Sequence, residues 1–397
     1  MKIAFTTVDL FKGREFLMPW RTVIEVVKRM NREGIDADVV SVPVSAVDVE
    51  ASSQEDPLVI QGMTIKTAPR DFGKFCEFAE KEEYDVVIYP TPWREALKGG
   101  FKEFCSLKCR KIAYFPGGVY GWTNNLALWR WAGLGFAKPY MIDTLTPYKR
   151  FAQMMKSCGF ETIVGLSPYT AETVKRAGFD KTVCILPGKD NFDKLPDSMD
   201  IFERVGLKAN EKYYLFTGAP APTRGAQVLA EACKRLARQK KGLDVPKVVF
   251  LMRKDVGSDF SVFLSSFDKI EDKTHVKLIT DKVSRSELKT LMAYARGVLL
   301  PFLVTPSEIP ITYFEVLSLG VPIITFENGG TTTYLKDALL TCESGSVTGL
   351  IENMKRLWTD DALHRQKSCN ALKIMSTHPT WDEVAMQWIE LVKGNRK

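Results

Sequence analysis

Residues 297–330 read GVLLPFLVTPSEIPITYFEVLSLGVPIITFENGG, and this stretch decides the fold. It begins with a buried-strand pattern, Gly297 to Phe302, and its middle holds an apolar helix from Phe314 to Leu319. A glycine and a proline follow the helix and end it. A second short strand, Val321 to Phe326, then runs into a Gly-Gly turn. Strand, loop, helix and strand in this order predict one unit of a parallel α/β sheet.

The loop before the helix, Pro306 to Thr312, is the predicted ligand site. It follows the carboxyl end of a parallel strand, where open α/β sheets bind their ligands. Backbone N–H groups at the start of the helix would face an anion. Glu315 would lie inside the first helical turn, with a carboxylate able to accept hydrogen bonds from hydroxyl groups.

These residues resemble the donor-binding signature of the retaining type B glycosyltransferases, the group 1 family that includes sucrose synthase-like enzymes and bacterial mannosyltransferases. In that family two glutamates are separated by seven residues, and a Gly-x-Pro and a Gly-Gly follow the second. Glu315 matches the second glutamate. Counting back from it reaches Ser307, and Glu308 is one place late. Either Glu308 takes the family's sugar-binding role through a shorter loop, or the sugar is bound differently.

A second match lies upstream, in residues 213–229, which read YYLFTGAPAPTRGAQVL. The family has an apolar strand, then a glycine, then a basic residue followed by another glycine. Gly218, Arg224 and Gly225 keep that spacing. In this chemistry the leaving group is a nucleoside diphosphate, and Arg224 can offer its oxygens a planar, permanently charged fork. An ordinary solvated charge on a loop is the alternative.

One cation of the family pattern is missing, because Ala219 occupies its place. Arg253 and Lys254, just after the apolar strand Val248 to Met252, are the nearest replacements. Gly13, in the loop after the first strand, matches a glycine that the family places near the donor phosphates. A solvated loop explains Gly13 equally well.

The resemblance thus implies a donor site in which Arg224 and Glu308 are catalytic and Glu315 binds the nucleotide ribose. Either Glu308 or Ser307 would bind the sugar hydroxyls. The donor-binding residues expected in full are Gly13, Gly218, Arg224, Arg253, Lys254, Ser307, Glu308, Ile309, Pro310, Ile311, Thr312 and Glu315.

The acceptor is expected in the first half of the chain, at residues 117–131. This predicted loop is rich in aromatic and amide side chains, which suit stacking on sugar rings and hydrogen bonds to hydroxyls. A hydrophobic lid and a partner surface are the alternatives. Many relatives have a catalytic-site histidine near this position, and this chain has no histidine there. The acceptor-side candidates are Gly117, Gly118, Tyr120, Trp122 and Asn124.

Composition is that of a two-domain enzyme and excludes little else. The 397 residues include 55 basic and 48 acidic ones, a net charge of +7 that is too weak and dispersed to indicate nucleic-acid binding. Eight cysteines without metal-ligand spacing indicate reduced thiols and hence the cytoplasm. No apolar run reaches the ~18 residues of a spanning helix. A homodimer and contact with a membrane surface are left open.

Strand and helix patterns alternate along the chain, as in parallel sheets with helices on both faces. We therefore expect the type B fold, two Rossmann-like doubly wound α/β domains facing a cleft. Residues 1–190 would form the acceptor-side domain and residues 191–375 the donor-binding domain. By the resemblance, a final helix within residues 376–397 would cross back to the first domain.

The expected activity is retaining transfer of a hexose from a nucleotide-sugar donor to a hydroxyl of a glycan or glycoconjugate. Among relatives GDP-mannose and UDP-hexoses are the usual donors, and GDP-mannose is slightly favoured. No cofactor and no metal are expected: the one Asp-x-Asp, Asp36-Ala37-Asp38, starts a strand in the other domain. A nucleotide-sugar epimerase, a phosphorylase and a non-catalytic sugar-nucleotide binding protein remain alternatives.

Overall fold

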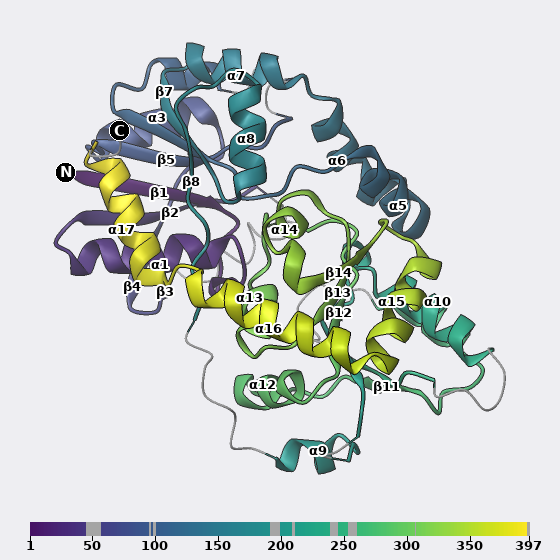
Figure 1. The fold of residues 1–397 in the computed structure, drawn as a ribbon. Helices are drawn as coiled ribbons and strands as arrows, with labels where there is room; N and C mark the ends of the chain where they lie inside the picture. The colour runs from purple at the N-terminus through teal and green to yellow at the C-terminus, as the bar shows by residue number, and fades with distance from the viewer. Residues whose placement is uncertain are drawn as a thin grey trace.

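The computed structural model describes residues 1–44, 57–94, 97, 101–190, 199–208, 211–238, 245–252, 260–305 and 307–394. It is an α/β protein with two sheets, each covered by helices on both faces (Figure 1). The strands alternate with helices along most of the chain. This is the two-domain α/β architecture that the alternating pattern predicts.

The first sheet contains eight strands in the order β3-β4-β2-β1-β5-β6-β7-β8. All its neighbouring strands run parallel except the β3–β4 pair, which is antiparallel. Its strands are β1 Lys2–Val8, β2 Asp36–Val42, β3 Leu58–Ile60, β4 Met63–Thr67, β5 Val86–Pro90, β6 Arg110–Tyr114, β7 Phe160–Gly165 and β8 Thr182–Cys184.

The second sheet contains six strands, all parallel, in the order β11-β10-β9-β12-β13-β14. Its strands are β9 Tyr214–Gly218, β10 Val248–Met252, β11 Val276–Ile279, β12 Gly297–Leu300, β13 Ile323–Phe326 and β14 Leu339–Cys342. They are almost wholly buried, as strands covered on both faces must be.

Helices fill the connections between the strands. The α-helices are α1 Trp20–Arg32, α3 Phe72–Lys81, α5 Trp122–Ala132, α6 Leu134–Leu145, α7 Tyr148–Ser157, α8 Pro168–Arg176, α9 Asp200–Arg204, α10 Ala226–Ala237, α11 Ser261–Phe267, α12 Arg285–Ala293, α13 Ile311–Ser318, α14 Gly329–Tyr334, α15 Val347–Thr359, α16 Asp361–Thr377 and α17 Trp381–Val392. Short 3-10 turns are η1 Arg14–Phe16, η2 Lys102–Cys105, η3 Pro222–Arg224 and η4 Lys336–Ala338.

Each sheet has one point at which the connections leave in opposite directions. In the first sheet this point lies between β1 and β5, and in the second it lies between β9 and β12. At the carboxyl ends of two such neighbouring strands, the loops turn away from each other and leave a crevice between the loops. The topology therefore places candidate ligand loops after β1, β9 and β12.

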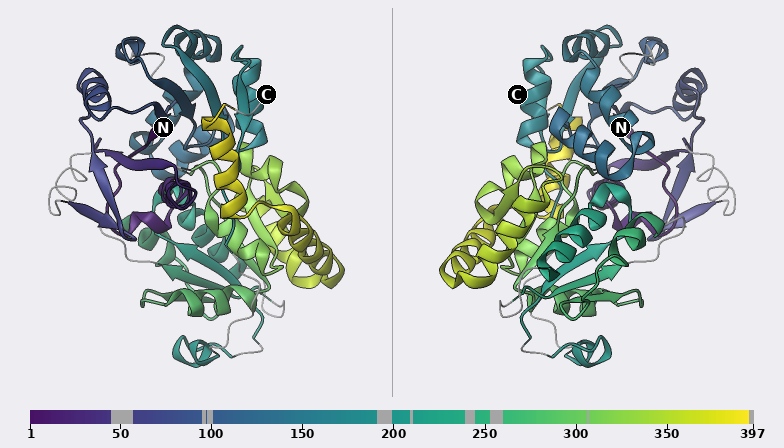
Figure 2. Two further views of the ribbon diagram at one scale, coloured as in Figure 1. Left: turned by 90° about the vertical axis from the view of Figure 1, so that its left-hand side faces the viewer. Right: turned by 90° about the vertical axis from the view of Figure 1, so that its right-hand side faces the viewer.

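The chain returns to the first sheet at its end. Helix α17 lies beside α1 (Figures 1 and 2), and its buried face contributes Val384, Trp388 and Ile389 to the core of the first sheet. The Trp388 ring lies 4.9 Å from that of Phe5 on β1, measured between ring centres. A capping box at Thr380 starts the helix.

Most of the elements predicted from periodicity are confirmed. The sequence predicts a helix from Phe72 to Lys81 and a capped helix from Ser167 to Ala177, and these are α3 and α8. Strand β10 has the predicted bounds. Two predictions need correction, and one hairpin was missed. The predicted loop at residues 117–131 contains helix α5, and the helix predicted to begin at Phe314 begins at Ile311. The hairpin of β3 and β4 was not predicted, although a Gln61-Gly62 turn with positive φ at both residues joins its strands.

Candidate functional site

Gly218 and Arg224 meet at the carboxyl end of β9. Gly218 ends the strand, and Arg224 ends the 3-10 turn that follows. A Cβ added at Gly218 would lie 2.7 Å from Nη1 of Arg224, so only a glycine lets the guanidinium approach the backbone this closely. The guanidinium also lies 5.5 Å from the ring centre of Phe302, in the loop after β12. The two residues matched by spacing are therefore neighbours in space.

The loops after β9 and β12 are joined to one another. Gly225 has φ +69, and a Cβ at this position would lie 2.0 Å from the carbonyl oxygen of Pro301. The N–H of Leu303 donates to the carbonyl of Thr223 at 2.9 Å. The loop after β12 thus holds the backbone of the loop that carries Arg224.

Glu308 lies at the contact between the two domains. Its carboxylate accepts from the hydroxyl of Ser167 at 2.5 Å and from that of Thr170 at 2.8 Å, both at the start of α8 in the first domain. Only 3% of Glu308 is exposed. Burial raises the pKa of its carboxyl to about 7, and the two hydroxyl donors oppose that rise.

The backbone of Glu308 is also engaged. Its N–H donates to the carbonyl of Pro116 at 3.2 Å, and its carbonyl accepts from the hydroxyl of Thr331 at 2.8 Å. The sequence predicted that N–H groups of this loop would face an anion. For Glu308 this is corrected, because the first domain supplies the acceptor. The predicted Gly-Gly turn is the first turn of helix α14. A Cβ at Gly330 would lie 1.7 Å from Oε1 of Glu308, so this glycine makes room for the carboxylate.

Glu315 is the fifth residue of α13, one turn later than predicted, because that helix begins at Ile311. Its Oε1 accepts from Arg285 at 3.3 Å, and Arg285 also donates to Asp190. Burial raises the pKa of Glu315, and the charge of Arg285 opposes the rise. The carboxylate therefore lies half-buried beside a cation.

Asp190 joins this cluster to the first domain. Its Oδ1 accepts from Arg21 of α1 at 2.6 Å and from the indole N–H of Trp381 at 3.0 Å. By its sequence position, Arg285 is only a residue of the capping box that begins α12 at Ser284. Only a long-range contact links it to Asp190, and no local pattern predicts such a contact.

The remaining residues of the predicted donor loop lie where α13 begins. Ser307 is buried, and its carbonyl accepts from the Thr305 hydroxyl at 2.6 Å. Ile309 belongs to the core of the second sheet, Pro310 is the N-cap of α13, and Ile311 packs on Met18 and Trp381. Thr312 is half-buried. The side chains of Ile309 and Ile311 thus serve packing, which leaves backbone groups as their means of contacting a donor.

Gly13 lies in the exposed loop after β1 with φ +95 and open space around it. The strand before it, β1, is one of the two strands at the switch point of the first sheet. Arg253, Lys254 and Pro306 lie outside the described residues.

The acceptor-side candidates have a different position from the one predicted. The Tyr120 hydroxyl donates to the carbonyl of Thr305 at 2.8 Å and accepts from the N–H of the same residue at 2.8 Å. The Asn124 amide donates to the carbonyl of Glu327 at 2.8 Å. Both side chains are buried. In this structure they contact the second domain, and neither side chain is exposed for contact with an acceptor.

Three of the five acceptor-side candidates remain outside this contact. Gly118 lies against the ring of Tyr120, so a Cβ there would be 3.0 Å from its hydroxyl oxygen, and Gly117 is half-buried. Trp122 starts α5 and is 47% exposed.

Among the described residues, no three His, Cys, Asp or Glu side chains come together in a way that could hold a metal ion. Asp38, in the Asp-x-Asp sequence, is held by Lys66 at 2.8 Å and by the Tyr84 hydroxyl at 2.8 Å. Asp38 is a half-buried ion-pair residue, and Asp36 is exposed.

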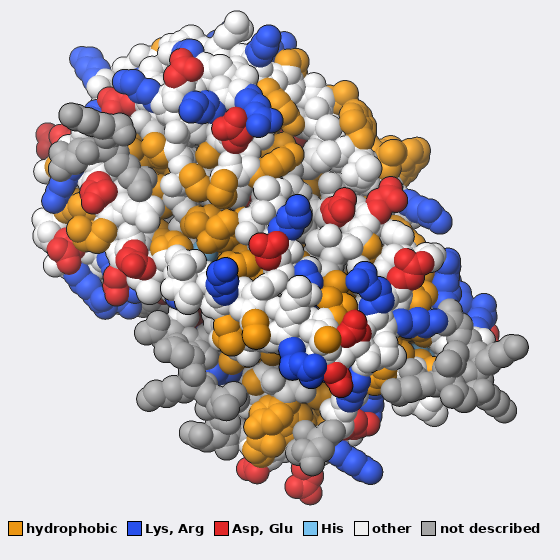
Figure 3. All heavy atoms as spheres, in the orientation of Figure 1, with side chains coloured by type: hydrophobic (Ala, Val, Ile, Leu, Met, Phe, Trp, Pro, Cys, Tyr) orange, Lys and Arg blue, Asp and Glu red, His pale blue; other side chains and the backbone are white. Residues whose placement is uncertain are grey.

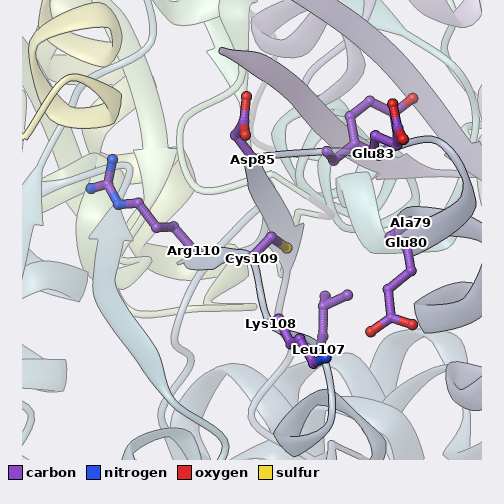
Figure 4. Close-up of a pocket in the computed structure, with 9 residues that line it drawn as sticks. Ala79, Glu80, Glu83, Asp85, Leu107, Lys108, Cys109 and Arg110 are labelled. Carbon is purple, nitrogen blue, oxygen red and sulfur yellow. The ribbon is translucent and has the colours of Figure 1, made fainter.

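One hollow of the surface lies away from all these loops. It is lined by side chains around the amino ends of β5 and β6, among them Asp85, Cys109 and Arg110 (Figure 4). The amino ends of parallel strands are opposite the carboxyl ends that hold the candidate loops. We assign this hollow no part in the site.

The comparisons with known proteins agree with this geometry. Residues 197–373 match the family model of the group 1 glycosyl transferases. The matched stretch is somewhat less than half of the chain. It contains β9 to β14, and so includes Gly218, Arg224, Glu308 and Glu315. No curated protein matches the chain.

Solved structures of glycosyltransferases share the fold over the whole length. Sucrose-phosphate synthase from Thermosynechococcus elongatus is 13% identical, with a TM-score of 0.71 over 100% of this chain and 99% of that one. HepE from Anabaena, in complex with UDP, is 13% identical, with a TM-score of 0.68 over 99% and 100%. WaaG, a glycosyltransferase involved in lipopolysaccharide biosynthesis, is 15% identical, with a TM-score of 0.64 over 99% and 100%. The two α/β domains of this chain therefore have the GT-B fold. In the described part of the chain no helix is long and apolar enough to cross a membrane.

Proposed function

We propose that this protein transfers a hexose from a nucleotide-sugar donor to a hydroxyl group of a glycan or glycoconjugate, with retention of the anomeric configuration. The observation that carries the proposal is the position of Arg224 at the carboxyl ends of β9 and β12, within the stretch that matches the group 1 glycosyl transferases. No observation favours an epimerase or a non-catalytic binding protein over a transferase.

Arg224 would stabilise the departing nucleoside diphosphate. As the bond to the sugar breaks, negative charge grows on the diphosphate, and a fixed cation lowers the energy of that state. The loop of Arg224 is held by the loop after β12 through Leu303 and Gly225. A cation that is already in place loses little free energy to reorganisation during the reaction.

Glu315 would bind the ribose hydroxyls of the donor. Its carboxylate lies half-buried on α13, beside Arg285 at the start of α12. The pair leaves acceptor positions on the carboxylate for hydroxyl donors, since an ionised carboxylate has about four lone-pair positions. The charge of Arg285 would at the same time favour the ionised form of Glu315, against the effect of burial.

Glu308 would bind the hydroxyls of the transferred sugar by exchange. Its carboxylate now accepts two hydroxyl hydrogen bonds, from Ser167 and Thr170. Two sugar hydroxyls are donors of the same kind, so they could replace the hydroxyls of Ser167 and Thr170 when the domains move apart. The exchange would couple donor binding to the relative position of the domains. Ser307 is the alternative contact.

We further propose that the reaction needs neither a bound metal nor a cofactor. Retention without a carboxylate nucleophile would require the acceptor hydroxyl to attack from the face that the leaving group vacates, so positioning and charge carry the catalysis. For the donor, GDP-mannose is favoured by the resemblance and a UDP-hexose is second; HepE was solved with UDP and with UDP-glucose. The cytoplasm is the proposed compartment, because all eight cysteines are free.

The test is transfer of label from a panel of sugar nucleotides to glycan and glycolipid acceptors, with EDTA present in half of the reactions. The proposal expects labelled product from one donor, with and without EDTA, and NMR should show the anomeric configuration of the donor retained. Inverted product would overturn the retaining mechanism. Interconversion of the sugar nucleotide without an acceptor would indicate an epimerase, and binding without turnover would indicate a non-catalytic protein.

A further inference from the structure

Helix α5 has an exposed apolar stripe that nothing within the described chain covers. Trp122, Leu126 and Trp129 are 47%, 51% and 52% exposed. They are spaced four and three residues apart, so they lie on one face of the helix. Two exposed tryptophans and a leucine on one short helix are unusual for a surface that faces only water.

The opposite face of α5 is already occupied. Asn124, Ala127 and Leu128 are buried, and Trp131 donates from its indole N–H to the carbonyl of Gly345 at 3.2 Å. Ala127 and Leu128 belong to the core of the second sheet. Helix α5 is therefore fixed on the second domain by one face, and the stripe points away from it.

The apolar surface continues into α6. Leu134 and Phe136, in its first turn, are 55% and 46% exposed. Figure 3 shows hydrophobic side chains along the edge of the molecule where Figure 1 places α6 and α5. The two helices are joined directly at Gly133, so the stripe and these two residues form one surface, here called the α5–α6 surface.

Exposed basic residues lie in the same segment of the chain as the α5–α6 surface. Arg130, Lys138, Lys149 and Arg150 are all exposed. Between residues 122 and 150 the only acidic residue is Asp143, and its carboxylate is paired with Arg94. The segment thus combines exposed aromatic and aliphatic side chains with an excess of positive charge.

We propose that the α5–α6 surface docks on a membrane that contains anionic lipid. Tryptophan prefers the interface between lipid and water, and the flanking cations would bind anionic headgroups. A symmetric dimer through the same surface would bring the cations of one copy against those of the other. This repulsion favours a lipid surface over a second copy of the chain. The proposal does not depend on the transferase activity.

Flotation of the full chain with lipid vesicles tests the proposal. The vesicles are phosphatidylcholine alone, or phosphatidylcholine mixed with phosphatidylglycerol. The parent chain should float with the mixed vesicles, and less so as salt is added, because salt screens the charge attraction. A chain that floats with neither kind of vesicle overturns the proposal.

Two variants locate the contact. Trp122→Ser, Leu126→Ser and Trp129→Ser together should abolish flotation. The matched control replaces Tyr294, Leu372 and Met386 by serine and should float like the parent. These are exposed hydrophobic residues at the end of α12, on α16 and on α17. Equal flotation of the stripe variant and the parent overturns the proposal. So does a parent that is dimeric in solution and becomes monomeric with the stripe variant, since a second copy then covers the surface.

A charge variant keeps the test decisive if the stripe variant folds poorly. Arg130→Gln with Lys138→Gln should weaken binding to the mixed vesicles by about fivefold for each cation. Arg365→Gln with Lys373→Gln, exposed residues of α16, should change it much less. If both double variants lost the same amount of vesicle binding, the assignment of the surface would be overturned, because only the overall charge of the protein would then matter.

Discussion

The hydroxyl of Ser167 lies 2.5 Å from Oε1 of Glu308, and this hydrogen bond joins the first domain to the predicted sugar-binding loop of the second. Thr170 adds a second hydroxyl one helical turn further on. The carboxylate is buried, so each donor matters more than it would at the surface. Several expected outcomes depend on this contact.

Thr170→Val should lower the free energy of unfolding by ~1–3 kcal/mol, because it leaves one oxygen of a buried carboxyl without its donor. Valine has nearly the shape of threonine, so packing changes little. The measurement is chemical denaturation near neutral pH. Thr173→Val is the matched control on the same helix: its hydroxyl donates only to the carbonyl of Tyr169, and the loss should stay below ~0.5 kcal/mol. Equal losses would argue against the interdomain role.

The pH dependence of stability should change in Glu308→Gln. The folded pKa of this carboxyl is raised from 4.5 to about 7, so the folded state binds the proton more tightly than the unfolded chain does. The contribution of Glu308 to the free energy of unfolding is therefore largest below pH 4.5, the pKa of the unfolded chain. It is lost as the pH rises through about 7. The largest loss is roughly 3 kcal/mol, at about 1.4 kcal/mol per pKa unit.

Unfolding of the parent and of Glu308→Gln is to be compared across that pH range. The parent should lose stability relative to the variant as pH rises from 4.5 to about 7. His378 titrates in the opposite sense, with a pKa lowered to about 4 by burial, and it is present in both proteins. A constant difference between the two proteins would show that Glu308 titrates normally.

Arg224→Ala should lower kcat by about 10²–10³-fold while the donor KM changes less, because the charge it stabilises develops only as the bond breaks. Arg224→Lys should recover part of the activity, since a point charge remains without the bidentate fork. The measurement is steady-state kinetics with the donor found by label transfer. If Arg224→Ala raised only KM, Arg224 would be a ground-state binding residue.

Glu315→Ala should weaken the binding of a nucleoside diphosphate by ~1–3 kcal/mol, as for the loss of a charged hydrogen-bond acceptor. Glu352→Ala, at an exposed position on α15 of the same domain, is the control and should bind like the parent. Titration calorimetry measures both. Unchanged affinity in Glu315→Ala would show that this carboxylate does not bind the ribose.

Local patterns predicted the fold well. Helix α3 and strand β10 have the bounds that periodicity assigned to them, because each buries one regular set of apolar side chains. Spacing also placed Gly218 and Arg224 together, since a strand and the turn after it form one local unit.

Contacts between the domains could not be predicted in this way. Glu308 and Ser167 are 141 residues apart, and Arg285 and Asp190 are 95 apart. Helix α5 was missed for a different reason. It has one apolar face on the second domain and another exposed, so its sequence lacks the contrast between apolar and polar sides that reveals a surface helix. Its aromatic and amide residues therefore looked like a sugar-binding loop.

The most direct test of the central claim is a calorimetric titration of the full chain with GDP-mannose, UDP-glucose, GDP and UDP. The site at the ends of β9 and β12 should bind one of these sugar nucleotides, and its nucleoside diphosphate, at one site per chain. If none of the four ligands gave a heat of binding, the result would contradict a nucleotide-sugar site at Arg224 and Glu315.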